Sequence, residues 1–341
     1  MSDTVFGMDT FGDVPTDDDG RLLSHPRAIR QVVDEVVLAD GAGVDVVALG
    51  EHHRPEYSIS TPETVLAGIA TRTSRIRLSS GVTVLSSDDP VRVYQRFATL
   101  DALSEGRAEV IVGRGSFTES FPLFGYSMSD YEVLFEEKLD LFVRLLDEQP
   151  VTWRGSTRAA LDGAQVHPTT GHRIPVWVGV GGSPESVVRT ARHDLGLMLA
   201  IIGGEPGRFA PYVDLYHRAV EQYGHAAKPV GMHAPGFVAD TDEEAKEIFF
   251  EPYKAQMDRI GAQRGWPPMS RARFEADVDG GALHVGSPET VARKIADSMR
   301  AVGAQRFDLI YTVGPQPVSA RLTAVELYGT KVIPMVRDML A

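Results

Sequence analysis

The hydrophobic positions of the 341-residue chain form short apolar runs that alternate with stretches in which apolar residues recur at helical spacing. A short apolar run bounded by turn residues is typical of a buried strand, and a repeat of about 3.6 residues is typical of an amphipathic helix. The predicted strands are Val5–Met8, Val44–Leu49, Ile76–Leu85, Ala108–Val112, Pro175–Val180, Leu197–Ile202, Val230–Val238 and Arg306–Tyr311. The predicted helices are Ala28–Ala39, Pro62–Arg72, Pro90–Ser104, Ser129–Glu148, Pro184–His193, Pro206–Tyr223 and Val318–Leu340.

This order corresponds to about eight β–α units in series. Strands that alternate with helices predict a parallel sheet, and eight such units favour closure into a TIM-type (β/α)₈ barrel of the α/β class. Two stretches interrupt the alternation. Gln149–Arg173 follows the fourth helix and predicts a small hairpin around Val151–Ala160, and Thr241–Gly281, in the seventh βα unit, predicts a lid over the barrel. Both are expected to be insertions in a single domain that spans residues 1–341.

Composition narrows the functional classes. The net charge of −13 disfavours nucleic acid as a partner, because an acidic surface repels phosphate backbones. The chain has no cysteine, which excludes disulfides, thiolate catalysis and cysteine-ligated metals. The first residues lack the pattern of a signal peptide, and no apolar stretch approaches the roughly 18 residues of a membrane span. We therefore expect a cytoplasmic protein without a membrane partner.

In a barrel, active-site residues follow the carboxyl ends of the strands. The second predicted strand is followed by Glu51, His52 and His53, a dense group of titratable side chains. Its histidines suit acid–base chemistry or hydrogen bonding, and two of them can face inward only if the chain turns there. A metal would require further ligands from other strand ends, and no second histidine-rich strand end is present.

Two other strand ends carry features that suit an anion. The fourth strand leads into Gly113–Ser116, in which Arg114 offers a bidentate clamp for phosphate. The fifth leads into Gly179–Ser186, where Ser183 reads as the N-cap and Pro184 as the first residue of a helix. Free backbone amides at such a helix start attract a phosphate. The third strand contains Gly81, which indicates a bulge or the close approach of a ligand.

Taken together, these segments resemble the luciferase-like flavin-dependent monooxygenases. The resemblance runs from about residue 4 to the C-terminus and is strongest over residues 44–202; the lid region matches poorly. The ordered set of motifs carries it, rather than any one of them. The segments are Ala48–His53, Ser80–Leu85, Asp89–Arg92, Leu103–Arg107, Gly113–Gly115 and Val178–Ser186.

The resemblance implies a barrel that binds reduced FMN and is dimeric. It places His52 near the reactive carbon of the flavin and makes Arg114 a phosphate ligand. It also implies a non-prolyl cis peptide between Gly81 and Val82 beneath the flavin ring. The remaining implied cofactor-binding residues are Asp9 and Thr10 at the ring, and Gly181, Gly182, Ser183 and Ser186 at the phosphate.

The activity implied is oxygenation of a small organic substrate by reduced FMN and O₂ through a C4a-hydroperoxide. The chain has no nicotinamide-binding fingerprint, so a separate NAD(P)H:flavin reductase is expected to supply the reduced flavin. Three alternatives stay open at this point. They are an F420-dependent oxidoreductase of the same fold, a metal-dependent barrel hydrolase that uses Glu51, His52 and His53, and a flavin-binding relative without catalytic activity.

Overall fold

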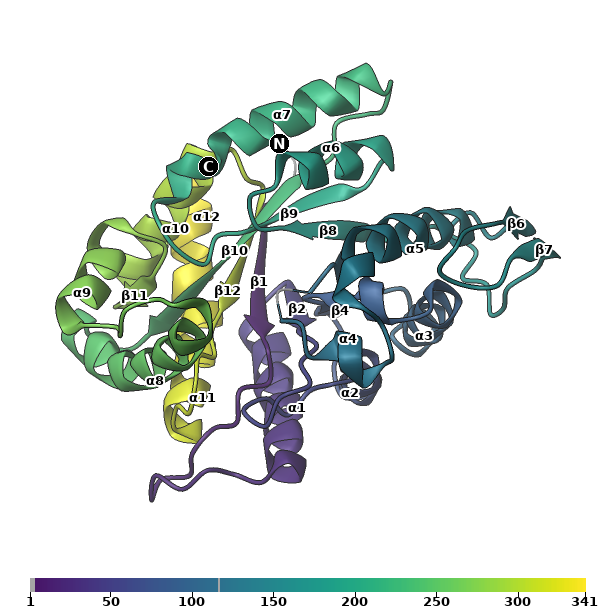
Figure 1. Ribbon diagram of the computed structural model, residues 1–341. Coiled ribbons are helices and arrows are strands. Elements are labelled where there is room, and N and C mark those ends of the chain that lie inside the picture. Colours follow the sequence, from purple (N-terminus) through teal and green to yellow (C-terminus); the bar gives the residue numbers. More distant parts are fainter. Residues whose placement is uncertain (1–3, 116) are drawn as a thin grey trace.

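The computed structural model describes residues 4–115 and 117–341, so Ser116 of the predicted Arg114 loop lies outside the described part. Its centre is a parallel sheet (Figure 1). The strands are β1 (Val5–Thr10), β2 (Val46–Leu49), β3 (Arg77–Ser80), β4 (Thr83–Val84), β5 (Val110–Gly113), β8 (Val176–Val180), β9 (Gly196–Ala200), β10 (Val230–Val238) and β12 (Arg306–Ile310).

The sheet closes into a barrel. Its strands pair in the order β3-β2-β1-β12-β10-β9-β8-β5-β4, and each of these pairings is parallel. Only Gly81 and Val82 separate β3 from β4, so these two strands are halves of one barrel position. A parallel bridge between Leu78 and Ala108 brings β3 beside the residue that precedes β5. The predicted TIM-type barrel is therefore confirmed.

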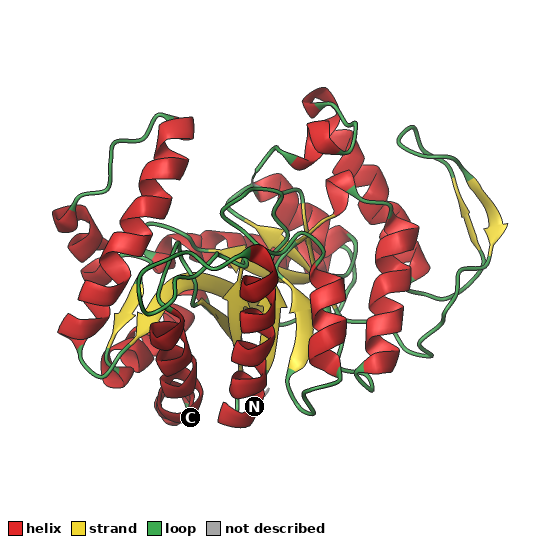
Figure 2. Cartoon of the chain, turned by 90° about the horizontal axis from the view of Figure 1, so that it is seen from below, coloured by secondary structure: helices red, strands yellow, loops and turns green. Residues whose placement is uncertain are grey.

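Helices surround the barrel (Figure 2). They are α1 (His25–Ala42), α2 (Pro62–Ala70), α3 (Pro90–Leu103), α5 (Tyr131–Leu145), α6 (Pro184–Arg192), α7 (Ala210–Gln222), α10 (Pro288–Val302), α11 (Val318–Leu327) and α12 (Ile333–Leu340). Several begin with proline in the first turn, where its missing N–H costs nothing. At α3 the Asp89 carboxylate accepts hydrogen bonds from the amides of Val91 and Arg92. No helix in the described part of the chain is long and apolar enough to cross a bilayer.

Two segments leave the alternating pattern, at the predicted places. After α5 the chain forms an antiparallel hairpin of β6 (Val151–Trp153) and β7 (Leu161–Ala164), which projects beside the helices in Figure 2. The second strand starts after Ala160, later than predicted. After β10 come α8 (Asp242–Arg264), α9 (Arg271–Gly280) and β11 (His284–Gly286), and β11 pairs with the end of β10. Phe249 and Phe274 anchor a separate small core beneath this segment.

The barrel interior contains a buried layer of charge that the sequence pattern did not predict. Arg306 pairs with Asp308, with 2.7 Å between Nη2 and Oδ2, and also with Glu109. Each of these three side chains is only 1% exposed. Burial of charge requires such pairing, because an isolated ion loses its hydration without compensation. Gly7 makes room for the layer, since a Cβ there would lie 2.2 Å from Oδ1 of Asp308.

Candidate active site

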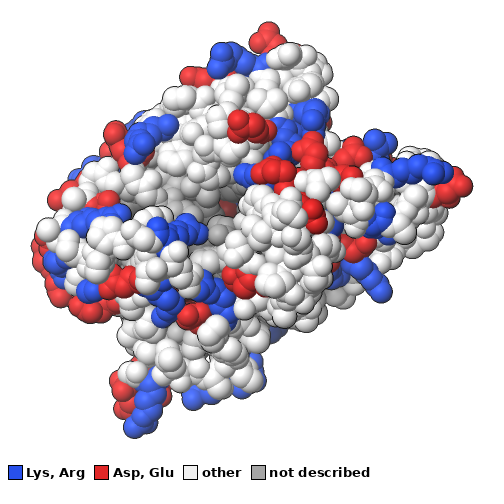
Figure 3. Space-filling model, viewed as in Figure 1, with Lys and Arg blue, Asp and Glu red and all other residues white. Residues whose placement is uncertain are grey.

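A cavity of about 540 Å³ lies at the carboxyl ends of the barrel strands. Figure 3 shows the surface hollowed near the centre of the view, where the barrel strands lie in Figure 1. Ile111, Gly179, Met198 and Ile310 contribute to its floor, and Met257 of α8 contributes to a wall. Helix α8 therefore borders the cavity, as expected of the predicted lid segment. Enzymes with a TIM barrel have their active sites at this end of the barrel.

His52 lies in an aromatic corner of this cavity. Its ring stacks on Tyr57 with 4.4 Å between centroids, and it meets the edges of Phe11 and Phe117 at 5.2 and 5.0 Å. Burial, assisted by electrostatic interactions with His53 and Arg54, lowers the pKa of His52 to about 3. The imidazole is therefore neutral at physiological pH and resists protonation.

His53 also faces the cavity, because the chain leaves β2 at Leu49 and turns. Its Nε2 lies 3.0 Å from Oε1 of Glu51, and the other carboxylate oxygen of Glu51 accepts a hydrogen bond of 2.8 Å from the amide of Val84. Glu51 thus ties the second strand end to the third. The carboxylate is engaged within the protein rather than free for a metal.

The peptide bond between Gly81 and Val82 is cis, as the resemblance implied. The side chain of Val82 lies against two glycines on neighbouring strands. A Cβ on Gly113 would lie 2.7 Å from Val82 Cγ2, and one on Gly179 would lie 2.9 Å from Cγ1. Since both distances are shorter than real Cβ contacts, these glycines are required for Val82 to occupy the cavity floor.

Of the residues predicted to bind a phosphate, Arg114 and Gly181 line the cavity, whereas Gly182, Ser183 and Ser186 are not among its lining residues. The charge of Arg114 helps to lower the pKa of Glu185, after hydrogen bonds from the backbone and Ser183. The guanidinium of Arg114 pairs with Glu132 and lies over the ring of Tyr131, 5.2 Å from its centroid. Arg114 is therefore close to the start of α6, and a carboxylate is its present partner.

The start of α6 has the predicted cap. The hydroxyl of Ser183 accepts a hydrogen bond of 3.3 Å from the amide of Ser186, and Pro184 occupies the first turn. Gly182 has a φ of +117°, which only glycine adopts without strain, and its carbonyl accepts from the Tyr212 hydroxyl at 2.8 Å. Around Gly181, a Cβ would meet no atom within 4 Å. The loop is therefore an open cradle of backbone.

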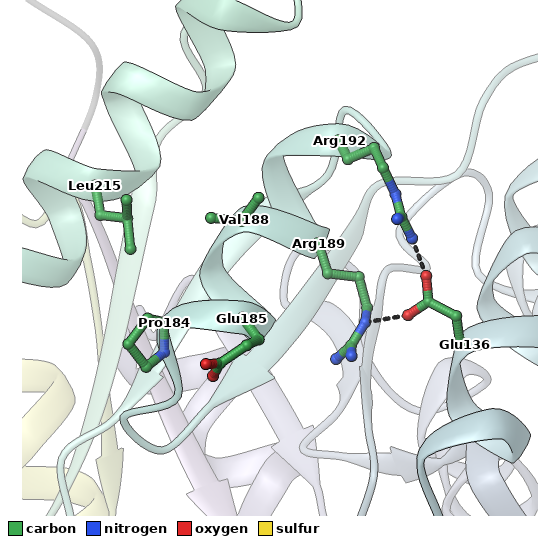
Figure 4. A pocket seen from close by; sticks show the side chains of 7 residues that line it. All are labelled: Glu136, Pro184, Glu185, Val188, Arg189, Arg192 and Leu215. Atoms are coloured by element: carbon green, nitrogen blue, oxygen red, sulfur yellow. Dashed lines mark hydrogen bonds and ion pairs between the residues drawn. The ribbon is translucent and has the colours of Figure 1, made fainter.

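Figure 4 shows the outer face of α6. Arg189 and Arg192 converge there on Glu136 of α5. Arg189 also reaches Glu132 at 3.4 Å, so Glu132 lies between Arg189 and Arg114. Three arginines therefore surround two carboxylates beside the cradle.

Asp9 and Thr10 lie beneath the cavity rather than among the residues that line it. Oδ2 of Asp9 is 2.6 Å from Nδ1 of His233, which does line the cavity. The hydroxyl of Thr10 bonds to that of Thr312 at 2.7 Å and accepts from the amide of Gly12 at 3.0 Å. The contact of Asp9 and Thr10 with a flavin stays a prediction. Within the protein, both side chains already have the hydrogen-bonding partners named above.

Sequence reasoning missed His233, since only residues after strand ends were considered. The available signal was a polar residue inside the apolar run Val230–Val238. It also missed Gln256 of α8, whose amide donates to Tyr57 at 3.3 Å and to Asp13 at 3.4 Å. Burial raises the pKa of Asp13 to about 6.

Of the aromatic side chains near these strand ends, Tyr57 and Phe117 line the cavity, whereas Phe121 is fully buried outside its lining. Phe124 is half exposed and meets the ring of His53 at 5.1 Å. Across residues 4–115 and 117–341, no three His, Asp or Glu side chains converge to hold a metal ion.

Comparison with known proteins agrees with this geometry. A 4-hydroxyprotoasukamycin monooxygenase from Streptomyces nodosus subsp. asukaensis is 27% identical over 319 residues, which cover 86% of this chain and 83% of that relative. The structure of monooxygenase RslO1 from Streptomyces bottropensis matches with a TM-score of 0.80 at 25% identity, over 97% of this chain and 99% of that one.

Two solved structures with lower identity share the fold. One is the oxygenating constituent of 3,6-diketocamphane monooxygenase from Pseudomonas putida in complex with FMN, with a TM-score of 0.78 at 20% identity over 97% and 98% of the two chains. The other is a coenzyme F420-dependent tetrahydromethanopterin reductase from Methanopyrus kandleri, with a TM-score of 0.74 at 19% identity over 98% and 99%. The family model described as luciferase-like monooxygenase matches residues 8–306, and the chain belongs to this family.

Proposed function

We propose that the protein is a monooxygenase that uses reduced FMN and O₂ to oxygenate a small organic substrate. One observation carries the proposal: a single cavity is lined both by Arg114 and Gly181, the predicted phosphate ligands, and by the aromatic residues around His52. A flavin mononucleotide has matching parts, a phosphate tail and a flat, largely apolar ring. Most of the chain's relatives described above are monooxygenases.

The phosphate would be held by Arg114 and by the loop that starts α6. Gly181 and Gly182 leave the backbone accessible, and the amides at the start of this nine-residue helix attract an anion. Ser183 and Ser186 complete this loop. Glu132 opposes an anion here, so a phosphate would compete with it for the guanidinium of Arg114.

The ring would rest on the floor at Gly81 and Val82, with Asp9 and Thr10 beneath it. When bound, reduced FMN supplies the electrons with which O₂ is activated. His52 is placed to take up and return a proton during the reaction. Because burial lowers its pKa, it would hold that proton weakly and return it readily. Phe11, Tyr57 and Phe117 keep water away from His52, which suppresses loss of the oxidising equivalents as hydrogen peroxide.

We also propose that a separate NAD(P)H:flavin reductase supplies the reduced FMN and that two copies of the chain assemble. A reductase partner is supported by the 3,6-diketocamphane relative, which is described as an oxygenating constituent and therefore works with a second component. The walls of the chamber, with Val84, Ile202 and Phe209 among them, favour a mainly apolar substrate.

Oxygen consumption tests the proposal. Purified protein, FMN, NADH and a flavin reductase are mixed with candidate apolar substrates, and O₂ uptake and oxygenated product are measured together. We expect product that contains one atom from ¹⁸O₂. Hydrogen peroxide alone, across a broad substrate panel, would argue for a flavin binder without catalytic activity.

The F420-dependent reductase of the same fold supports a second candidate, hydride transfer with F420. F420 also carries a phosphate, so Arg114 does not distinguish the two cofactors. An F420-dependent enzyme would reduce or oxidise its substrate under anaerobic conditions, whereas the proposed monooxygenase would be inactive without O₂.

A further inference from the structure

The floor of the cavity contains an acid–histidine pair with no role assigned so far. Nδ1 of His233 lies 2.6 Å from Oδ2 of Asp9, and the two side chains are 10% and 1% exposed. Asp9 comes from β1 and His233 from β10, on either side of β12. Oδ1 of Asp9 is buried and has no hydrogen-bond partner among the described residues. Asp9 therefore occupies the Nδ1 edge of the imidazole, and His233 lines the cavity.

Charges beneath the pair are already matched. Arg306 pairs with Asp308 and Glu109, and Glu109 also receives Arg77 at 3.2 Å. Two arginines thus face two carboxylates. The carboxyl group of Asp9 has only His233 as a basic hydrogen-bonding partner in residues 4–115 and 117–341.

An unbalanced negative charge at this depth would be costly, because the interior solvates ions poorly. Burial accordingly raises the pKa of Asp9, while the contact with His233 lowers it. The pair therefore favours arrangements with no net charge. These are an imidazolium beside a carboxylate, or a neutral imidazole beside a protonated carboxyl group.

Both neutral arrangements have the same consequence for the cavity. In the first, both ring nitrogens of His233 carry hydrogen. In the second, the carboxyl group of Asp9 donates to Nδ1, so the single ring hydrogen lies on Nε2. In each case, Nε2–H is the donor that remains on the edge not occupied by Asp9.

We propose that His233, positioned by Asp9, donates its Nε2–H to an oxygen of a planar ring ligand on the cavity floor, and that this oxygen belongs to a phenolate, an enolate or a ring carbonyl. The neighbouring lining residues Met198, Pro235 and Ile310 are apolar and suit the face of such a ring. This inference rests on the proposed function and deepens it by naming a substrate class. The substrate would contain an oxygen-bearing aromatic or enolic ring rather than a plain hydrocarbon.

The probe for the test is 4-nitrophenol, because its ionised form absorbs visible light and its neutral form does not. Flavin-free protein is titrated with the probe in a buffer below the probe's own pKa. We expect the ratio of ionised to neutral probe to rise about tenfold on binding, the scale of one hydrogen bond to a charged group. Absence of this rise in the wild-type protein overturns the proposal.

Two substitutions of His233 distinguish loss of the Nε2–H donor from a general disturbance of the structure. His233→Asn places an amide where Nδ1 was and keeps a bond to Asp9, but removes the cavity donor; the rise should disappear. His233→Gln places an N–H near the position of Nε2 and should restore part of it. Asp9→Asn should reduce the rise without changing the affinity for nitrobenzene, which has the same ring and no hydroxyl group. An unchanged rise in His233→Asn overturns the proposal.

The matched control is His217→Asn, since His217 is exposed on α7 away from the cavity. It should behave as the wild type does. Repeating the titration with saturating oxidised FMN identifies the source of the ring oxygen. If the signal persists, the oxygen that accepts from His233 belongs to the substrate. If FMN abolishes the signal by competition, that oxygen belongs to the flavin ring. Protein that gives the nitrophenolate signal but binds no FMN would refute the proposed function and leave this inference intact.

Discussion

Replacing Arg114 with alanine tests the anion-binding end of the cavity. A hydrogen bond between a guanidinium and a phosphate contributes about 1.5–3 kcal/mol. A phosphate would have to displace Glu132 from Arg114, and the lost ion pair reduces the net gain in binding free energy. The side chain of Glu132 is 64% exposed. Such exposed pairs contribute about 0–1 kcal/mol. Arg114→Ala should therefore weaken FMN binding by about 0.5–3 kcal/mol, roughly two- to 150-fold in Kd.

The assay is fluorescence titration of the protein with FMN and, in parallel, with riboflavin, which has the same ring but no phosphate. Arg114→Ala should weaken FMN binding and leave riboflavin binding unchanged. Glu132→Gln should act in the opposite direction, because it frees the guanidinium. Arg173→Ala is the control, since Arg173 pairs with Asp147 on the surface. Equal losses for FMN and riboflavin, or no loss for either, would refute a phosphate contact by Arg114.

Three further predictions concern His52, His284 and Arg306. His52→Ala should keep FMN binding while oxygenated product falls and hydrogen peroxide rises; unchanged coupling removes His52 from the mechanism. Burial lowers the pKa of His284 to about 3 in the folded state, against about 6.5 unfolded. The free energy of unfolding is therefore unaffected by His284 above about pH 6.5 and falls as the pH is lowered, by about 2 kcal/mol at pH 5. In urea unfolding, the stability of His284→Gln should depend less on pH than that of the wild type. An identical pH dependence in the two proteins would contradict the assignment. Arg306→Met leaves Asp308 buried without a guanidinium and leaves Glu109 with Arg77 alone. It should cost about 3–5 kcal/mol in urea unfolding, whereas a loss under about 1 kcal/mol would contradict the charge balance.

The barrel could be predicted from the sequence because its information is local. Each strand is a short apolar run, and several helices begin with a proline. At α6, both Ser183 as the N-cap and Pro184 in the first turn were predicted and are confirmed. The hairpin after α5 was predicted at its first strand, but the second begins at Leu161, because Leu161–Ala164 lacks an apolar alternation that would mark it.

Contacts across the barrel were not predictable in the same way. Asp9 and His233 are 224 positions apart, and their strands both flank β12, a neighbourhood that only closure of the sheet creates. Arg114 was predicted to be an anion ligand from its loop, but its pairing with Glu132 depends on which face of α5 turns toward that loop. Periodicity locates a helix without fixing its rotation against a neighbour. The cis bond at Gly81 was implied only by the resemblance.

The most direct test of the account is one anaerobic titration that compares reduced FMN, oxidised FMN and F420 on the purified protein. We predict that reduced FMN binds most tightly, that oxidised FMN binds the same site, and that admission of air with a suitable substrate then yields oxygenated product. Preferential binding of F420, or no binding of either form of FMN, would contradict the proposal that this cavity is the flavin site of a monooxygenase.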